Sequence, residues 1–150
     1  MDDLDRKILG LLERDARLTY AAIGAQVGLA ASSAHDRVRK LERRGVIRGF
    51  RADIDLDAAG LPITAFVSLS LRPASPANVP ALVAELPLVQ SCYSVAGESS
   101  YVVVVRAPST KALEELLDAL RAKLEVVTRS TIVLSTPFED RPMSAEGAAG

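Results

Sequence analysis

The sequence has 150 residues but only one cysteine, one histidine and no tryptophan, and its aromatic residues amount to 4%. The lone Cys92 cannot form a disulfide within the chain, and it argues against a metal site built from cysteines. With His35 as the only histidine, no Ser-His-Asp set and no His-Cys metal spacing stands out. Neither a P-loop nor a dinucleotide glycine fingerprint occurs. We therefore expect no catalytic residues, no metal and no cofactor.

The sequence also lacks a long apolar run. No stretch of about eighteen uncharged apolar residues occurs, so no transmembrane helix is predicted. The first residues, MDDLDRK, are acidic and precede no apolar segment of the kind that signal peptides need, so we expect a cytoplasmic protein. Apolar residues nevertheless make up 49% of the chain, which suffices for real hydrophobic cores in one ordinary domain or two small ones.

The net charge of −1 conceals an uneven distribution. Residues 1–51 contain eleven Lys or Arg against seven Asp or Glu, whereas residues 52–150 contain seven against twelve. The first part therefore carries +4 and the second −5. Such an asymmetry is typical of a nucleic-acid-binding segment joined to a segment with another task.

The basic part begins with two short predicted helices. Apolar residues at helical spacing predict the first over residues 3–14. Thr19 would cap a second helix over residues 20–26, and Gly28 would end it. Gly24 lies inside this second helix, where it costs about 1 kcal/mol relative to alanine. We interpret Gly24 as a point where a neighbouring helix packs closely.

A third helix should begin near Ala30 and end at Gly45. One stripe of it is apolar and would face the core, and it consists of Ala34, Val38 and Leu41. Ala30 has no side-chain oxygen with which to cap the helix, at a cost of about 1 kcal/mol. The start could therefore shift so that Ser32 or Ser33 becomes the cap.

The other sides of this third helix are polar early and cationic late. Between residues 37 and 51 there are seven Lys or Arg but a single acid, Glu42. Hydroxyl groups could reach base edges in a DNA major groove while the cations reach phosphates. A charged helix face is often merely solvated, but the preceding amphipathic helix, the glycine turn and a basic strand over residues 46–54 favour a winged helix-turn-helix. The candidate DNA-binding residues are Ser32, Ser33, Arg37, Arg39, Lys40, Arg43, Arg44, Arg48 and Arg51.

The chain changes its pattern after this basic part. Residues 53–62, DIDLDAAGLP, are acidic and turn-prone and predict a linker. Strands are then predicted at residues 63–72, 89–95, 101–107 and 126–135, with helices at residues 76–86 and directly after Ser109. The order β-α-β-β-α-β predicts an α+β protein whose second domain is ferredoxin-like.

The predicted sheet has one face that its own helices would not cover. Residues of the first strand alternate, with Ala65, Val67, Leu69 and Leu71 on one side and Phe66, Ser68 and Ser70 on the other. Residues 101–107 contain four consecutive valines, so we expect this strand to be buried on both faces. The open face therefore predicts a dimer in which a second copy covers it.

The run VGLAASSAHDRVRKLERRGVIRGFRADID resembles the Lrp/AsnC transcription regulators, the leucine-responsive or feast/famine group. The matching positions are Gly28, Leu29, Arg37, Val38, Leu41, Glu42, Gly45, Ile47 and Gly49, and Phe50 stands where tyrosine is usual. The resemblance extends from Leu4 to about Glu139. It implies a DNA-binding domain over residues 1–52, a linker over 53–62 and an effector-binding and oligomerisation domain over 63–139. Residues 140–150 lack apolar periodicity and predict a flexible tail.

The resemblance also implies an effector. Members of this family assemble dimers into larger rings, commonly of four dimers, and amino acids or similar small molecules bind between dimers. The family turn V-x-G-[DE]-x-D-[YF] reads VAGESSY here, at residues 95–101. Gly97 and Glu98 fit, whereas Ser100 replaces the aspartate that relatives often present to an ammonium group. The implied effector-binding residues are Ser94, Gly97, Glu98, Ser99, Ser100, Tyr101, Thr110, Thr131 and Val133, each of which could equally serve ordinary strand and loop packing.

The sequence thus leads to a DNA-binding transcription regulator whose assembly or DNA affinity responds to a small effector. Two alternatives stay open. One is a DNA-organising protein of the same fold that needs no effector, which the altered Ser100 favours. The other is a haem-precursor decarboxylase with the same two-domain plan. Such enzymes depend on histidines around the tetrapyrrole. This chain has only one histidine, His35, which argues against this alternative.

Overall fold

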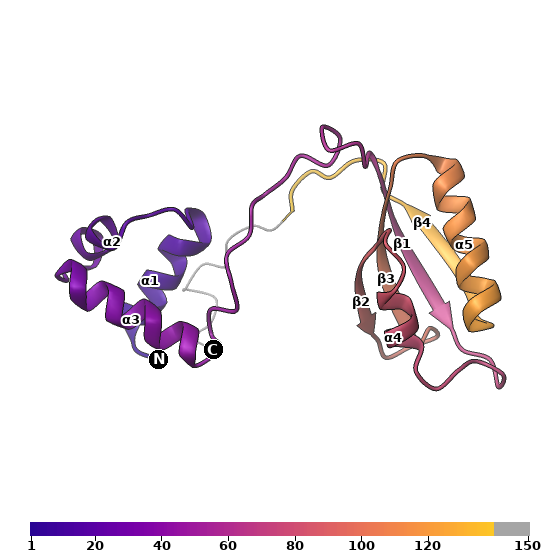
Figure 1. Cartoon of the computed structure of the whole chain (residues 1–150), viewed down its shortest axis with the longest axis horizontal. Helices are drawn as coiled ribbons and strands as arrows, with labels where there is room; N and C mark the ends of the chain where they lie inside the picture. Colours follow the sequence, from indigo (N-terminus) through magenta and orange to yellow (C-terminus); the bar gives the residue numbers. More distant parts are fainter. Residues whose placement is uncertain (140–150) are drawn as a thin grey trace. The chain divides into compact units, whose positions relative to one another are not determined.

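The computed structural model describes residues 1–139, which form two compact units. One unit comprises residues 1–53 together with Phe138 and Glu139, and the other comprises residues 54–137. Figure 1 labels their helices and strands. The tail predicted over residues 140–150 lies outside the described residues. Within residues 1–139, no helix is long and apolar enough to cross a membrane.

Three helices build the first unit: α1 (Asp3–Arg14), α2 (Tyr20–Val27) and α3 (Ala31–Arg43). Their facing stripes form one buried core, which contains Ile8, Leu12, Ile23, Ala34, Val38 and Leu41. The apolar stripe predicted for the third helix is therefore confirmed. The helix-turn-helix arises because α2 ends at Gly28, whose φ of 73° reverses the chain at no steric cost, and α3 starts three residues later.

The caps of α2 and α3 differ as their sequences require. The Thr19 hydroxyl accepts a hydrogen bond from the Ala22 N–H (3.2 Å), as expected for the start of α2. Helix α3 has Ala30 at its cap position and no side-chain cap at all. The shifted start that would have made Ser32 or Ser33 the cap does not occur. Both hydroxyls are consequently free of a capping role and lie exposed in the first turn of α3.

Gly24 is required, but not by a neighbouring helix as the sequence suggested. A Cβ atom at Gly24 would lie 2.4 Å from the backbone carbonyl oxygen of Leu29, in the turn between α2 and α3. The same turn closes with a hydrogen bond from the Leu29 N–H to the Gly24 carbonyl (2.8 Å). The turn folds back tightly over α2, and no side chain fits between them.

The wing predicted over residues 46–54 is wrong. The described residues of the first unit contain no strand. The N–H groups of Val46 and Ile47 instead bond to the Leu41 carbonyl (3.0 and 3.3 Å) and complete the end of α3. The physical reason is that a β-ribbon needs a second strand, and the described residues of this unit offer none.

The second unit has the predicted element order: β1 (Ile63–Ser70), α4 (Val79–Ala84), β2 (Val89–Ser94), β3 (Tyr101–Ala107), α5 (Thr110–Leu124) and β4 (Val127–Ile132). The four strands pair antiparallel in the order β2-β3-β1-β4, which confirms the ferredoxin-like arrangement. Helix α4 is shorter than predicted at both ends: it begins at Val79, and at its C-terminal end Pro87 disfavours helical backbone in the residue before it. Ser109 caps α5 as expected, by accepting from the Ala112 N–H (3.1 Å).

The two faces of the sheet are unequal. Ala65, Val67 and Leu69 of β1 are fully buried in the core, as are Val103 and Val105 of β3. Cys92 packs at the edge of this core, and burial raises the pKa of its thiol. Side chains of the opposite face are more open: Phe66 is 45% exposed, and Val102 and Val104 are only half-buried. Burial of β3 on both faces is thus not achieved within one chain, and the dimer that would complete it stays a prediction.

Candidate nucleic-acid interface

The outward face of α3 is held toward solvent by the burial of its opposite side. Ala34, Val38 and Leu41 are at most 1% exposed and fix the rotation of the helix about its own axis. The sequence-predicted residues on the remaining sides are exposed along the whole length of α3 and at its C-terminal cap: Ser32, Ser33, Arg39, Lys40, Arg43 and Arg44. The structure therefore leaves six of the nine candidate DNA-binding residues exposed on α3 and its cap, and a seventh on this helix, Arg37, is only partly exposed.

The cations of this face are available to a ligand. Within residues 1–139, no carboxylate pairs with Lys40, Arg43 or Arg44. Arg39 lies 3.4 Å from Glu42, but its side chain is 61% exposed, and such surface pairs are weak and easily exchanged. A phosphate backbone approaching α3 would therefore meet positive charge that is not already neutralised.

Arg37 is in a different position. One guanidinium nitrogen, Nη1, donates to Asp2 Oδ2 and to Asp5 Oδ1, both at 2.7 Å. Its side chain is only 31% exposed, and that of Asp5 is 11% exposed. The DNA contact predicted for Arg37 stays a prediction, but its charge is already satisfied on the side of α3 that faces the start of α1.

The hydrogen bonds at this cluster shift three pKa values. The Asp5 N–H and then the Arg37 guanidinium hold the pKa of Asp2 below its usual value. Burial acts to raise the pKa of Asp5, but the Asp2 N–H and the Arg37 guanidinium outweigh it and the pKa falls. The two carboxylates in turn raise the pKa of Arg37. All three groups are therefore charged at neutral pH.

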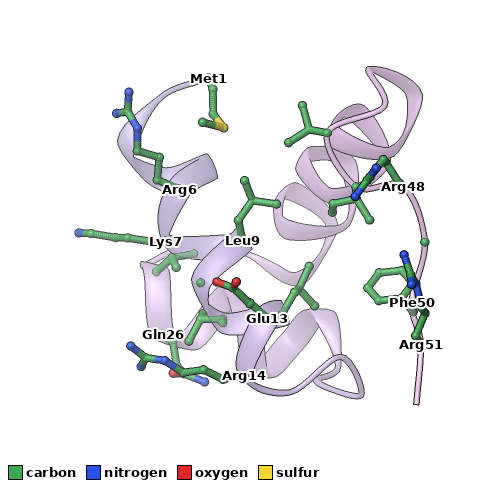
Figure 2. A pocket seen from close by; sticks show the side chains of 17 residues that line it. Met1, Arg6, Lys7, Leu9, Glu13, Arg14, Gln26, Arg48, Phe50 and Arg51 are labelled. Atoms are coloured by element: carbon green, nitrogen blue, oxygen red, sulfur yellow. The ribbon is translucent and has the colours of Figure 1, made fainter. Parts of the chain in front are cut away.

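Arg48 and Arg51 lie on a groove rather than on a wing. The groove has a volume of about 860 Å³ and runs between α1 and the segment that follows α3. Figure 2 shows Arg6, Lys7 and Arg14 on its α1 side and Arg48, Phe50 and Arg51 on the other. The two predicted wing cations therefore belong to a second basic surface, with an apolar floor, whose role in DNA binding stays a prediction.

Two features of this unit escaped sequence reasoning. Asp2 and Asp5 form a reciprocal cap at the start of α1, and a D-x-x-D spacing before an apolar run could have signalled the cap but not its partner thirty-two residues away. His35 stacks edge-on against Tyr20, with ring centroids 4.7 Å apart, and this contact links α3 to α2. No sequence pattern in the chain pointed to this aromatic pair.

The predicted effector turn follows β2 and is held by hydrogen bonds to the end of β1. Gly97 has a φ of 141°, which side-chain-bearing residues rarely adopt. The Ser100 N–H donates to the Leu69 carbonyl (2.9 Å), and the Ser70 hydroxyl donates to the Glu98 carbonyl (3.3 Å). The Glu98 carboxylate projects into solvent and lies 3.8 Å from Arg129 of β4. The turn thus presents backbone groups and one carboxylate on a fixed frame.

The nine predicted effector residues do not form a single pocket in one chain. Ser94 pairs with Tyr101, beside the turn, where Tyr101 lies opposite Leu69. A second group lies at the other end of the sheet, where Ala107 of β3 is opposite Ile63 of β1. Thr110 follows that end of β3, and the Val133 N–H donates to the Thr64 carbonyl near it. Thr131 lies between the two groups. Six residues of antiparallel strand span about 20 Å, so a site that uses both groups needs more than one copy of the chain.

Comparison with known proteins matches both units. Residues 1–42 match the model of the AsnC-type helix-turn-helix domain, and residues 64–143 match that of the Lrp/AsnC ligand binding domain. The chain is 44% identical over 142 residues to the HTH-type transcriptional regulator LrpA of Mycobacterium tuberculosis, covering 94% of this chain and 95% of that protein. It is 36% identical to the HTH-type transcriptional regulator AldR of Mycolicibacterium smegmatis, covering 89% and 81%.

The structure is also similar to solved structures. One is a feast or famine regulatory protein from M. tuberculosis complexed with L-methionine, with a TM-score of 0.89 and 44% identity. The similarity covers 93% of this chain and 96% of that one. Both domain models, the identity over nearly the whole chain and the shared fold agree, and the chain belongs to the Lrp/AsnC family of transcriptional regulators.

Proposed function

We propose that the protein binds double-stranded DNA through α3 and regulates transcription. The observation that carries the proposal is the exposed face of α3, where Lys40, Arg43 and Arg44 have no carboxylate partner in the described residues. Ser32 and Ser33, free of capping, are placed in the first turn, which is the part of a recognition helix that reads base edges. The cations near the end of the helix would neutralise phosphates and set the register.

In this mechanism two copies present two α3 helices to successive half-sites on one side of the duplex. Each half-site would be read by the hydroxyl-bearing first turn, with Arg39 and Arg43 on the outward side of the helix. The Arg48 and Arg51 groove would add charge beside the main surface. We propose no catalytic role for any residue, because relatives of this chain are named as transcriptional regulators. The protein would act in the cytoplasm, with access to DNA.

DNA binding is tested by titrating random-sequence duplexes at several salt concentrations. Each phosphate contact contributes about −0.9 to the slope of log K against log salt. Replacing Lys40 and Arg43 by glutamine should flatten the slope by about two such increments. Lys111→Gln, on α5 of the other unit, is the matched control and should leave the slope unchanged. Absence of salt-dependent affinity in the unaltered protein would contradict the proposal.

We further propose that the second unit binds an amino acid between copies. Support comes from the turn at Gly97 and Glu98 and from the division of the predicted residues between two parts of the sheet. The relative solved with L-methionine makes that amino acid the first probe. Dimers through the open sheet face would assemble further, and we propose an octamer of four dimers. The effector would shift this assembly through its different affinity for the alternative states.

The effector is tested by thermal unfolding with L-methionine and the other proteinogenic amino acids, with the mass in solution measured in parallel. A ligand that binds only the folded protein must raise the melting temperature. A rise with one or a few amino acids, together with a change in mass, supports the proposal. No rise with any of them favours the second candidate, a DNA-organising protein that needs no effector. Ser100, which offers no charge to an ammonium group, is the observation that keeps this candidate open.

A further inference from the structure

We propose that Arg37 is a positioning residue, which holds α3 against the start of α1 and so sets the position of α3 when it meets DNA, without contacting DNA itself. The inference rests on the proposed DNA-binding function. It assigns the residue a role opposite to the one that its place among seven cations suggests. The two carboxylates that accept from it, on Asp2 and Asp5, become part of the DNA-reading machinery although they carry the wrong charge for DNA.

The geometry shows a prepared receptor for one guanidinium. The Asp2 N–H donates to Asp5 Oδ2 (3.1 Å), and the Asp5 N–H donates to Asp2 Oδ1 (2.8 Å). In each carboxylate, one oxygen thus accepts the capping hydrogen bond of α1 and the other accepts a hydrogen bond from Arg37, at 2.7 Å in both cases. Because the cap already fixes both carboxylates, little further side-chain freedom is lost when Arg37 binds them.

The charges around Arg37 argue against a phosphate there. Arg37 lies in a hollow of about 530 Å³ whose other lining residues are Asp2, Asp5, Asp36, Lys40 and Arg43. Three carboxylates balance three cations, so the hollow has no formal charge. A phosphate drawn to Arg37 would approach two carboxylates that lie within 3 Å of the guanidinium, and their repulsion opposes the attraction. Lys40 and Arg43 line the same hollow, but no carboxylate pairs with either of them within residues 1–139, so they are better phosphate ligands than Arg37.

The two hydrogen bonds from Arg37, here called the Arg37 clamp, matter for DNA because they add directional contacts to the apolar packing of α3. Helix α3 has 13 residues, and Arg37 is the seventh, in the middle of the helix. A shift of the whole helix by roughly 2 Å along α1 is enough to break hydrogen bonds of ordinary length to bases or phosphates. The pair of bonds from Arg37 to the start of α1 opposes such a shift.

The experiment compares variants of the full chain by DNA affinity and salt slope, on one duplex selected for tight binding. Arg37→Gln should weaken binding at least about tenfold, with the slope of log K against log salt unchanged. Asp5→Asn should also weaken binding, although it makes the protein more positive. The variant that combines Arg37→Gln with Asp5→Asn should bind DNA no more weakly than the single variant with the lower affinity, because each single change already breaks the Arg37–Asp5 interaction. Lys40→Gln should weaken binding and flatten the slope by about 0.9.

Controls separate position from charge and from folding. Asp3→Asn removes a neighbouring carboxylate that pairs with Arg6 and not with Arg37, and it should leave DNA affinity unchanged or slightly higher. Arg37→Lys keeps the charge, but its ammonium lies one bond closer to the main chain than Nη1 and cannot reach both carboxylates, so the variant should weaken binding with an unchanged slope. Melting temperatures measured alongside show that each variant is folded at the temperature of the titration.

Three results would overturn the inference. The first is a slope for Arg37→Gln that flattens as it does for Lys40→Gln. The second is tighter binding by Asp5→Asn, which is what simple removal of a negative charge near DNA would cause. The third is wild-type affinity in folded Arg37→Gln or Arg37→Lys. If the unaltered protein shows no salt-dependent DNA affinity, the proposed function fails instead, and the two failures are therefore distinguishable.

Discussion

The two units of this chain differ in how complete they are. In the first unit, the helix that would read DNA is fully positioned within a single chain, by a buried apolar stripe, a tight turn and the Arg37 clamp. In the second unit, one face of the sheet is left exposed, and the predicted effector residues lie in two separate parts of the sheet. We infer that each copy carries a complete helix for the proposed DNA binding, whereas the proposed effector response needs copies to assemble.

The largest expected effect breaks the first unit alone. Gly24→Ala would place a Cβ atom 2.4 Å from the Leu29 carbonyl oxygen, and neither backbone segment can move without opening the helix-turn-helix. We expect a loss of about 3 kcal/mol or more in the free energy of unfolding of this unit. Thermal unfolding followed by circular dichroism should then show the second unit melting separately and unchanged.

Gly10→Ala is the matched control for this experiment. Gly10 lies in α1, and nothing stands within 4 Å of the position of its Cβ atom. Alanine there should stabilise the first unit by up to about 1 kcal/mol, because alanine is the better helix former. A destabilisation by Gly10→Ala equal to that by Gly24→Ala would mean that steric contact at the turn is not the cause.

The next largest effect comes from a substitution that prevents assembly and leaves each chain folded. Phe66 is 45% exposed on the open sheet face, opposite Val104 of β3 and Thr131 of β4. Phe66→Lys should leave each chain folded and reduce the mass in solution to that of one chain, because a charge cannot be buried there without a partner. DNA affinity should fall by about a hundredfold, since two linked reading heads bind more tightly than one. An unchanged mass would show that copies assemble through another surface.

A smaller effect is the loss of stability of the first unit at acidic pH, which distinguishes it from the second unit. The pKa values of Asp2 and Asp5 are lowered in the folded protein, by hydrogen bonds from each other's N–H groups and from Arg37. A carboxyl with a lowered folded pKa stabilises the fold fully above its unfolded pKa, and this stabilisation is lost as pH falls through the folded value. The first unit should therefore lose stability below about pH 4.

The measurement is the urea midpoint of each unit between neutral pH and pH 3, with Asp5→Asn as the comparison. The variant should be less stable at neutral pH and should lose less on acidification, because one of the two titrating groups is gone. An identical pH dependence in the variant and the unaltered protein would mean that other carboxylates govern acid unfolding.

Sequence patterns specified the elements well but not the contacts between distant residues. The spacing of Ala34, Val38 and Leu41 predicted the buried side of α3, and the β-α-β-β-α-β order predicted the sheet, because both depend on local periodicity. The wing failed because a strand is defined by its partner. The same limit applies to Arg37, whose helical position is local information but whose partners in α1 depend on how the helices pack.

The smallest expected effect concerns the effector turn. Glu98 is the one carboxylate that the turn itself presents, and its side chain is 91% exposed beside Arg129. If Glu98 takes the place of the missing aspartate at Ser100, Glu98→Gln should weaken L-methionine binding by about fivefold, the value of one exposed charge-assisted contact. Glu114→Gln, on the exposed side of α5, should change nothing. The measurement is the rise in melting temperature as L-methionine is titrated.

Arg129→Gln sharpens this last test because it should change L-methionine affinity in the direction opposite to Glu98→Gln. Arg129 competes with an ammonium group for the Glu98 carboxylate, at a distance of 3.8 Å. Its removal should free the carboxylate and strengthen binding, by no more than a few-fold because exposed ion pairs are weak. Weaker binding by Arg129→Gln would instead mean that Arg129 holds the carboxylate of the effector, and the pair would then read both ends of an amino acid.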